Sequence, residues 1–495
     1  EVLDELGNTV LYGHPDAQAI LTKIQVENDR LLILRNTVEG ERPAGFVSYR
    51  EIGNEDLFGV LKDMELANLV RGKSSREILL ITGIYAREDG TGDSGVIRDA
   101  PQQLLVEVLA KELEKNYSFA LFVAERGTAT KEVVYVLERQ GFIRPHMADE
   151  NDKRTIYMVD MHEPLMFLHN LDTTIKEPFA SNPAVLRAIE KNHKKLQIAM
   201  TKLYPGNLVL SLSCGVMHHR LVDRITSLND VPREPLVPRR LGKNMCVPFG
   251  KILRGKVVPN TVTKTLHTDK VYEPDLESYT IEPFPYYSPL NSQIETIRSF
   301  DRPVILVDDL VHKADRLQVL VPKLRETGIP IKKVVVGVLS GYGRDLMQQL
   351  KVPVESIYSM PNVRQWFVES TLYPFIGGDT VRREEMKVAG LQPSINMILP
   401  YTTPRLEDCG REALFDFSEC CLENARDLFR MLEGLYRAQY GRNLTLARLS
   451  EAVILPLCPD KGSCMSYDEN LAPSVYLEND LELLRRTRAF ALGGE

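Results

Sequence analysis

The sequence predicts an α/β protein with a mixed-sheet domain, a second domain built on a doubly wound parallel sheet, and a helical C-terminal extension. Three observations support this fold class. Strands and helices alternate over residues 1–165 and again over 166–385, and the strands of the second region are near-continuous apolar runs, as in sheets covered on both faces. Residues 386–495 are mainly helical in pattern, with their longest amphipathic stretch at 417–440. A chain of 495 residues is also too long for one hydrophobic core.

Composition narrows the classes of function. The chain is 43% hydrophobic and carries a formal net charge of −7, which argues against a general nucleic-acid coat or a polybasic membrane binder. No apolar run approaches the ~18 residues that a membrane span requires. The seven cysteines include no C-x-x-C pair, so we expect neither a disulfide framework nor a cysteine zinc site, and we predict a reduced, cytoplasmic protein. The chain starts at Glu1 without a secretory signal, which indicates a trimmed chain or a piece of a longer one.

Residues 1–165 follow the pattern hairpin, strand, helix, strand, helix, strand. The first helix is indicated by apolar residues at helical spacing, and Pro101 suits its first turn. Gly141 suits the C-cap of the second helix. The expected elements, in order, are a hairpin of strands 31–36 and 44–52, a strand at 77–86, a helix at 101–116, a strand at 119–125, a helix at 131–140 and a strand at 155–161.

This order of elements, with AGFVSYREI at 44–52 and VLERQGF at 136–142, resembles the GNAT acyltransferase superfamily over about residues 15–165. The resemblance implies binding of acetyl-CoA, whose pyrophosphate the family holds on a glycine turn that leads into a helix. It also implies transfer of an acyl group to an amine.

The glycine turn corresponds to residues 87–100, a segment longer than the family's own. The candidate cofactor-binding residues in it are Gly90, Gly92 and Gly95. Four carboxylates in the same segment would repel a pyrophosphate. The family's general-acid tyrosine would fall at Leu137, and helical geometry directs the nearby Tyr135 elsewhere. A GNAT fold that serves as scaffold or regulatory module therefore stays open beside an acyltransferase.

Residues 166–385 open with a helix start, in which Asn182 is the expected N-cap and Pro183 occupies the first turn. Apolar strands and amphipathic helices then alternate, which predicts a parallel sheet. The expected strands are 207–213, 304–309, 332–340 and 356–360, and the expected helices are 217–225, 291–300, 314–328 and 344–350.

Two adjacent carboxylates, Asp308 and Asp309, end the apolar strand that begins at Val304. In a parallel α/β sheet, ligands bind beyond the carboxyl ends of the strands. Such a pair can accept hydrogen bonds from the two hydroxyls of a ribose, or it can orient a hydrated Mg²⁺. The alternative is that one aspartate caps the following helix while the other is simply exposed.

The stretch 304–316 runs through four apolar residues, Asp308 and Asp309, two more apolar residues and a five-residue turn. It resembles without gaps the phosphoribosyl-pyrophosphate motif of type I phosphoribosyltransferases. The resemblance implies that the two acids hold the ribose and Mg²⁺ in catalysis and that the turn wraps the 5′-phosphate. The family's turn is Thr-Thr-Gly-x-Thr, whereas this chain has His-Lys-Ala-Asp-Arg, without the glycine that eases the approach of backbone amides. Lys313 and Arg316 are therefore the candidate phosphate ligands, as side-chain cations.

The same family has a pyrophosphate loop after an earlier strand and a basic hood loop. Gly215, directly after the expected strand 207–213, is the matching small residue of the first. Between residues 239 and 270, eight cations stand against the single acid Asp269, and glycines and prolines predict a loop or short hairpin. The eight cations are Arg239, Arg240, Lys243, Lys251, Arg254, Lys256, Lys264 and Lys270.

Three interpretations of the basic stretch stay open. It is a solvated surface, a phosphate or pyrophosphate site that folds over the acidic pair, or a groove for single-stranded nucleic acid. The last is disfavoured because Phe249 is its only aromatic residue apart from histidine. In the second interpretation Arg254 and Lys256 are hood cations, and His267 is a proton donor or a phosphate ligand.

Three functions follow as hypotheses. The first is binding and transfer of a phosphorylated ribose, as phosphoribosyl pyrophosphate or a nucleotide-like small molecule, with Mg²⁺. The second is a CoA-dependent N-acyltransferase with a ligand-sensing C-terminal half, and the third is a non-enzymatic nucleotide sensor. The chain is also similar to the back half of long bacterial proteins with a nucleotidyltransferase-like front domain. A covalently linked upstream domain or a homo-oligomer is therefore the expected assembly, and we expect the helical extension to pack or to dimerise.

Overall fold

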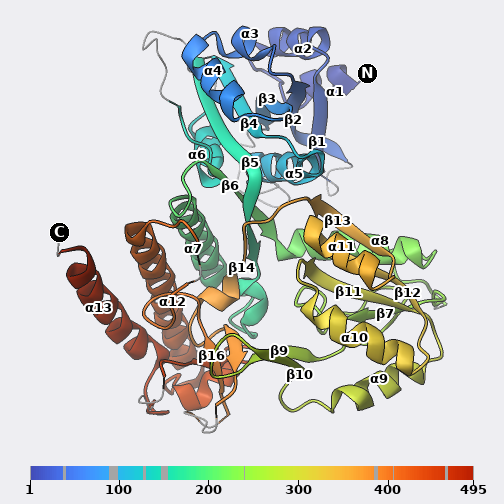
Figure 1. The fold of residues 1–495 in the computed structure, drawn as a ribbon, viewed down its shortest axis with the longest axis vertical. Coiled ribbons are helices and arrows are strands. Elements are labelled where there is room, and N and C mark those ends of the chain that lie inside the picture. The colour runs from blue at the N-terminus through green and yellow to red at the C-terminus, as the bar shows by residue number, and fades with distance from the viewer. Residues whose placement is uncertain are drawn as a thin grey trace. The chain divides into compact units, whose positions relative to one another are not determined.

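The chain folds into two compact units, shown in the computed structural model of Figure 1. Unit 1 comprises residues 1–166, 204–211 and 359–365, and unit 2 comprises residues 167–203, 212–358 and 366–495. The structure describes residues 2–36, 41–87, 99–125, 130–145, 154–238, 240–383, 388, 390–404, 406–462 and 467–493. No helix within these ranges is long and apolar enough to cross a membrane.

A mixed sheet contributes most of its strands to unit 1. Its strands are β1 (Arg30–Asn36), β2 (Arg42–Ile52), β3 (Ile78–Ala86), β4 (Phe119–Glu125), β5 (Arg154–His169), β6 (Asn207–Ser213) and β14 (Gln365–Val368). They lie in the order β1-β2-β3-β4-β5-β14, with β6 also paired to β5. The hairpin β1–β2 is antiparallel, as are β2–β3 and β4–β5, whereas β3 and β4 run parallel.

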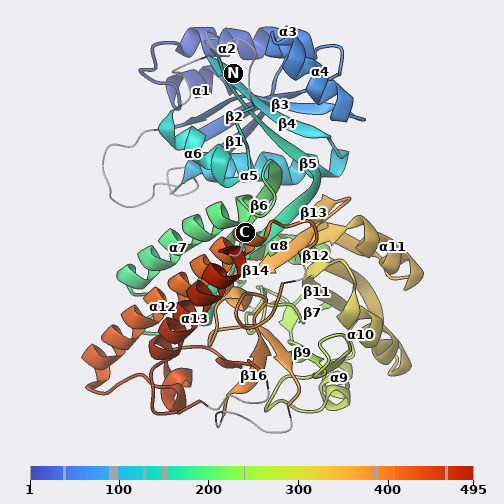
Figure 2. The ribbon, with the colours of Figure 1, turned by 60° about the vertical axis from the view of Figure 1, so that its left-hand side comes forward.

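Helices cover both faces of this sheet, as Figure 2 shows. On one face, Leu6 and Ile24 pack on Phe46 of β2, and Leu61 packs with Ile78 of β3. The helices are α1 (Val2–Asn8), α2 (Ala17–Val26), α3 (Leu57–Leu61), α4 (Met64–Lys73), α5 (Ala100–Glu112), the short η1 (Leu113–Lys115) and α6 (Lys131–Arg139). The strands and helices predicted over residues 31–161 are all present, and β5 continues eight residues beyond its predicted end.

Unit 2 contains an all-parallel five-stranded sheet in the order β13-β12-β11-β7-β8. Its strands are β7 (Met245–Pro248), β8 (Val262–Thr263), β11 (Val304–Val311), β12 (Ile331–Ser340) and β13 (Val354–Met360). Its helices are α8 (Cys214–Leu228), α9 (Leu290–Arg298), α10 (Asp315–Glu326) and α11 (Gly341–Gln349). Apolar residues of β7, β11 and β12 form one buried core with α9 and α10. The predicted fold class is confirmed.

Two strands differ from the prediction. Strand β6, which we expected in the parallel sheet, pairs with β5 of the mixed sheet. Strand β7, which we expected to be part of a loop, pairs in parallel with β11. It was missed because it is only four residues long and ends at Pro248, between segments rich in glycine and proline. Its side chains are nevertheless fully buried, from Met245 to Val247.

A second five-stranded sheet and three long helices complete unit 2. The sheet has the order β10-β9-β15-β16-β17. Its strands are β9 (Thr268–Tyr272), β10 (Tyr279–Pro283), β15 (Asp379–Val381), β16 (Gln392–Ile395) and β17 (Leu457–Pro459). The remaining helices are η2 (Leu171–Thr174), α7 (Pro183–Thr201), η3 (Glu369–Leu372), α12 (Arg411–Tyr440), η4 (Leu446–Glu451) and α13 (Pro473–Leu492).

Helices α7, α12 and α13 lie side by side (Figures 1 and 2), so the helical C-terminal segment packs on the helix that opens the second region. Asn182 caps α7 as predicted, because its Oδ1 accepts a hydrogen bond from the Ala184 N–H at 2.9 Å.

Candidate functional site

The acidic pair lies near the carboxyl end of β11, a strand of the parallel sheet that has β7 on one side and β12 on the other. The backbone N–H groups of Lys251 and Ile252, which follow β7, donate to the two carboxylate oxygens of Asp309 at 2.6 and 2.9 Å. Asp309 is buried, and both of its oxygens are engaged by the backbone of this neighbouring loop. Its carboxylate therefore holds the loop in place.

The loop approaches the acids so closely that only glycine fits at position 250. A Cβ on Gly250 would lie 2.5 Å from Asp309 Oδ1 and 2.7 Å from Asp308 Oδ1, both shorter than real Cβ contacts. Gly250 thus lets the main chain lie directly against both carboxylates.

Asp308 has a different environment. Its Oδ1 accepts the Asp309 N–H at 2.9 Å, and among the described residues its other oxygen accepts no hydrogen bond. Burial raises the pKa of Asp308 to about 7, with the Asp309 charge adding to the rise and the Arg316 and Arg254 cations opposing it. Asp308 is therefore the acid with a free oxygen, and it can gain or lose a proton near neutral pH.

Three half-buried cations lie near the pair: Lys251, Arg254 and Arg316. Arg254 and Arg316 act on the charge of Asp308, and Lys251 acts with Arg316 on that of the neighbouring Asp379. Burial lowers the pKa of both Lys251 and Arg254, and the neighbouring cations lower them further. Arg316 Nη1 reaches the Phe249 carbonyl at 3.5 Å. Within the described part of the chain, none of the three cations has a carboxylate within 4.0 Å. Partly desolvated cations without a carboxylate partner favour the binding of an anion.

Two further carboxylates lie on the neighbouring strands β9 and β15. Asp269 accepts hydrogen bonds from the Thr380 hydroxyl at 2.6 Å and from the Lys270 N–H at 3.0 Å. Burial raises the pKa of Asp379, with the Lys251 cation opposing the rise. The site therefore contains both carboxylates and cations that form no close ion pair. Because the carboxylates would repel an anion alone, this arrangement is better suited to a phosphate group accompanied by a divalent cation.

The five-residue turn after β11 contains a backbone conformation that is typical of glycine, although no glycine is present. Ala314 has φ 52° and ψ 26°, in the left-handed region, and it immediately precedes α10. His312 Nδ1 lies 2.8 Å from Ser340 Oγ, and burial together with the Lys313 charge lowers the pKa of His312. Lys313 is exposed, and Asp315 forms an ion pair with the β9 lysine described above, at 2.6 Å.

Solved structures of two kinds match the chain. One is a chain of the NatC complex bound to Gag peptide and CoA, 11% identical with a TM-score of 0.21, over 29% of this chain and 79% of that chain. Another is FeeM, an N-acyl amino acid synthase from uncultured soil microbes, 16% identical with a TM-score of 0.19, over 30% and 92%. The third is a purine phosphoribosyltransferase from Pyrococcus horikoshii Ot3, 12% identical with a TM-score of 0.20, over 31% and 87%.

The GNAT and phosphoribosyltransferase resemblances of the sequence are thus both matched among solved structures. At these identities the matches concern the fold alone. No protein-family model and no curated protein matches the chain.

The three residues predicted for the hood loop differ from one another in their surroundings. Arg254 lies over the Phe284 ring at 4.9 Å and within electrostatic range of the acidic pair. His267 stacks on Tyr287 with ring centroids 3.8 Å apart, and burial lowers its pKa, followed by the charge of Arg254. Lys256 is exposed.

Gly215 lies in the first turn of α8, which follows β6 of the mixed sheet. The loop that contacts the acids is a different one, which follows β7. The two regions still lie near each other. Burial raises the pKa of the Cys214 thiol to about 12, with the charge of Asp309 adding to the rise and that of Lys256 opposing it. The predicted cofactor glycines at 90, 92 and 95, and Arg239 of the basic stretch, fall outside the described residues.

Sequence reasoning did not single out Gly250, Lys251, Asp269 and Asp379 as site residues. For the first two a signal existed, because they directly follow the apolar run MCVPF at 245–249. Asp379 had none, since it lies 70 positions after Asp309 in the chain. Only the pairing of β15 with β9 brings it to the site.

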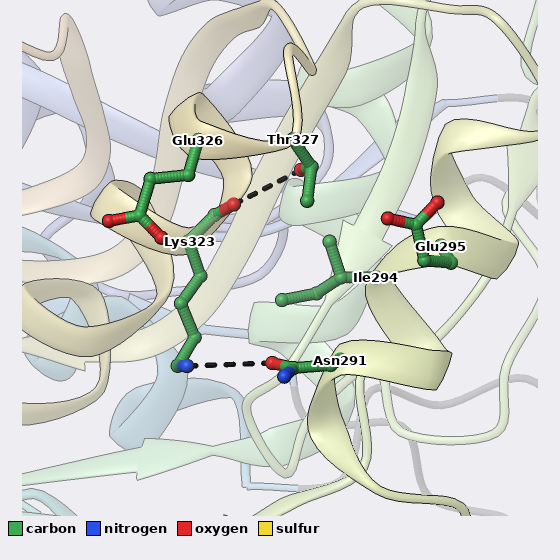
Figure 3. A pocket seen from close by; sticks show the side chains of 6 residues that line it. All are labelled: Asn291, Ile294, Glu295, Lys323, Glu326 and Thr327. Atoms are coloured by element: carbon green, nitrogen blue, oxygen red, sulfur yellow. Dashed lines mark hydrogen bonds between the residues drawn. The ribbon is translucent and has the colours of Figure 1, made fainter.

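A groove lies between α9 and α10, at the C-terminal end of α10 (Figure 3). Its lining residues are Asn291, Ile294, Glu295, Lys323, Glu326 and Thr327. Lys323 Nζ contacts Asn291 Oδ1 at 3.5 Å, and the Thr327 hydroxyl donates to the Lys323 carbonyl at 3.0 Å. Arg316 of the site lies in the first turn of α10, about 10–15 Å along the helix axis from the groove residues Lys323 and Glu326. The groove is separate from the acidic pair.

Proposed function

We propose that unit 2 binds a phosphorylated ribose compound together with Mg²⁺ at the carboxyl end of β11. The observation that carries the proposal is the group of three half-buried cations, Lys251, Arg254 and Arg316. They lie near the acidic pair and Asp379, and among the described residues none of them has a carboxylate within 4.0 Å. A polyanion that brings its own divalent cation would neutralise both the cations and the carboxylates of the site.

The two acids take different roles in this proposal. Asp308, with its unoccupied oxygen, accepts a hydrogen bond from a ribose hydroxyl or from a water of hydrated Mg²⁺. Asp309 keeps the loop at 249–252 against β11, which places Lys251 over the site. Mg²⁺ usually takes one or two carboxylates and completes its shell with water and substrate phosphates, so one free acid suffices.

Transfer of the ribose would use the same groups. When the bond between C1′ and a pyrophosphate oxygen breaks, the pyrophosphate leaves with the electron pair and the sugar becomes oxocarbenium-like. Lys251, Arg254 and Arg316 would stabilise the growing negative charge on the leaving group, and an acceptor would then attack C1′. Positioning and charge stabilisation therefore supply most of the acceleration.

The test is calorimetric titration of phosphoribosyl pyrophosphate with Mg²⁺ into wild type, Asp308→Asn, Arg316→Gln and Lys332→Gln. The last variant removes an exposed cation of β12 and is the matched control. We expect saturable binding in wild type and in the control, and at least a tenfold loss in the other two, since one charge-assisted hydrogen bond contributes about 1.5–3 kcal/mol. Absence of binding in wild type, or equal binding in all four proteins, contradicts the proposal. Release of pyrophosphate with a panel of acceptors would distinguish a transferase from a sensor.

A second candidate function concerns unit 1. Strands β3 and β4 pair in parallel only from Leu79–Ala120 to Ile81–Phe122, although both strands continue. Beyond that point β3 pairs only with β2, and β4 pairs only with β5. The backbone groups that the two strands leave open toward each other could receive the amide groups of an extended acyl-CoA arm. Titration of acetyl-CoA into the full chain tests this, and absence of binding would leave unit 1 as a scaffold.

A further inference from the structure

A second cluster of chemically capable side chains lies within unit 2, apart from the acidic pair. It joins His169 at the end of β5, His193 in α7 and Glu369 at the start of η3. One ligand atom from each residue lies within 4.8 Å of those of the other two. The three residues come from segments as much as 200 positions apart, so no local motif marks them in the sequence.

Each oxygen of the Glu369 carboxylate faces a different imidazole. Oε1 lies 2.5 Å from His193 Nδ1, and Oε2 lies 3.9 Å from His169 Nδ1. The two imidazole rings have centroids 4.2 Å apart and are inclined at 72°. The 3.9 Å separation is too long for a hydrogen bond, but one ion with bonds of about 2.0–2.2 Å can bridge it.

The carboxylate of the cluster is fully buried. The side chain of Glu369 is 0% exposed, and those of His169 and His193 are only 16% and 19% exposed. Among the described residues, no lysine or arginine lies within 4.0 Å of this carboxylate, and Oε2 accepts no hydrogen bond. A buried carboxylate of this kind is stabilised by a proton of its own, by a proton on a neighbouring histidine or by a bound cation.

The donor set selects the kind of cation. Two imidazole nitrogens and one carboxylate oxygen suit borderline divalent transition-metal ions, whereas Mg²⁺ and Ca²⁺ prefer oxygen ligands throughout. Cys421 of α12 and Tyr373, which follows η3, are fully buried and interact electrostatically with Glu369.

We propose that His169, His193 and Glu369 bind one divalent transition-metal ion of the Zn²⁺ type. The ion ties the end of β5 to α7 and η3. Because its ligands are nearly closed off from solvent, it serves structure and not substrate chemistry. The proposal is independent of the phosphorylated-ribose site, whose residues it does not use.

The test is metal binding by the full chain after treatment with EDTA and re-addition of Zn²⁺ or Co²⁺. The variants are Glu369→Gln and His169→Asn, and His162→Ala is the matched control. His162 also lies on β5 and also contacts a carboxylate, with its Nδ1 2.8 Å from Asp160 Oδ1, but it has no third ligand in the described chain.

We expect one ion per chain in wild type and in His162→Ala by elemental analysis, and substoichiometric metal in the other two variants. The visible absorption of the Co²⁺ form should report nitrogen and oxygen ligands, and Zn²⁺ should raise the Tm of wild type only when the three ligands are intact. Far-ultraviolet circular dichroism checks that each variant is folded. Failure of the wild type to retain Zn²⁺ or Co²⁺ after desalting would overturn the proposal, as would equal retention by Glu369→Gln.

Discussion

Replacement of Asp309 by asparagine tests whether the second acid of the pair positions the loop after β7. The two oxygens of Asp309 accept hydrogen bonds from the N–H groups of Lys251 and Ile252, at 2.6 and 2.9 Å, and the residue is only 9% exposed. Asparagine offers one oxygen and one NH₂ group. One of the two backbone N–H groups therefore loses its acceptor and faces another donor.

The expected cost follows from these two bonds. A hydrogen bond to a charged group contributes about 1.5–3 kcal/mol, and a neutral one about 1 kcal/mol. Asp309→Asn loses one charged bond outright and turns the other into a neutral bond. The free energy of unfolding of unit 2 should therefore fall by about 2–5 kcal/mol.

Urea unfolding followed by the fluorescence of Trp366 measures this change, because the chain has a single tryptophan and it lies in unit 2. Asp345→Asn is the control, since it removes the same charge from an exposed position of α11 and should change stability by no more than about 0.5 kcal/mol. A loss at Asp309→Asn that is no larger than in the control would refute the role of Asp309 in holding the loop.

Three further predictions concern the same region. The stability that Asp308→Asn gains over wild type should grow as pH rises from about 4 to about 7. In that window folded wild type keeps on Asp308, with its pKa of about 7, a proton that the unfolded chain, at the ordinary 3.8, has lost, so wild type loses stability as pH rises; denaturant midpoints from pH 4 to 8 check this. Gly250→Ala should destabilise unit 2 by about 1–3 kcal/mol, measured by the same unfolding assay, since its Cβ would meet both carboxylates. Ala314→Gly should leave the free energy of unfolding undiminished, because φ is 52° there and glycine adopts that conformation without strain. Ala438→Gly, at an exposed helical position, should lower the free energy of unfolding by about 1 kcal/mol, and equal losses in the two variants would contradict the strain assigned to Ala314.

The sequence was most informative where a local pattern determines both structure and chemistry. The apolar run before Asp308 and Asp309 predicted a buried strand, and the structure places both acids near its carboxyl end. The N-cap of α7 at Asn182 was predicted for a similar reason, since capping depends on residues within one turn.

The parts that escaped prediction depend on contacts between distant segments. Strand β7 is recognisable only beside β11, because four residues that end in proline carry too little periodic signal. Strand β6 has the apolar character of a parallel strand, but its partner β5 belongs to the mixed sheet. The pairing of β15 with β9 brings Asp379 to the site, and no sequence pattern marks that pairing.

The turn after β11 adopts a left-handed backbone conformation although it contains no glycine. Ala314 holds the left-handed conformation at a cost of about 1–2 kcal/mol relative to glycine. Hydroxyl groups are missing from the turn, and its Lys313 points to solvent. The cations that could replace them come from the loop after β7, at Lys251 and Arg254, and from Arg316 in α10. Because the Asp309 carboxylate holds that loop, the proposed ligand-binding role of Asp308 and of the loop cations depends on the supporting role of Asp309.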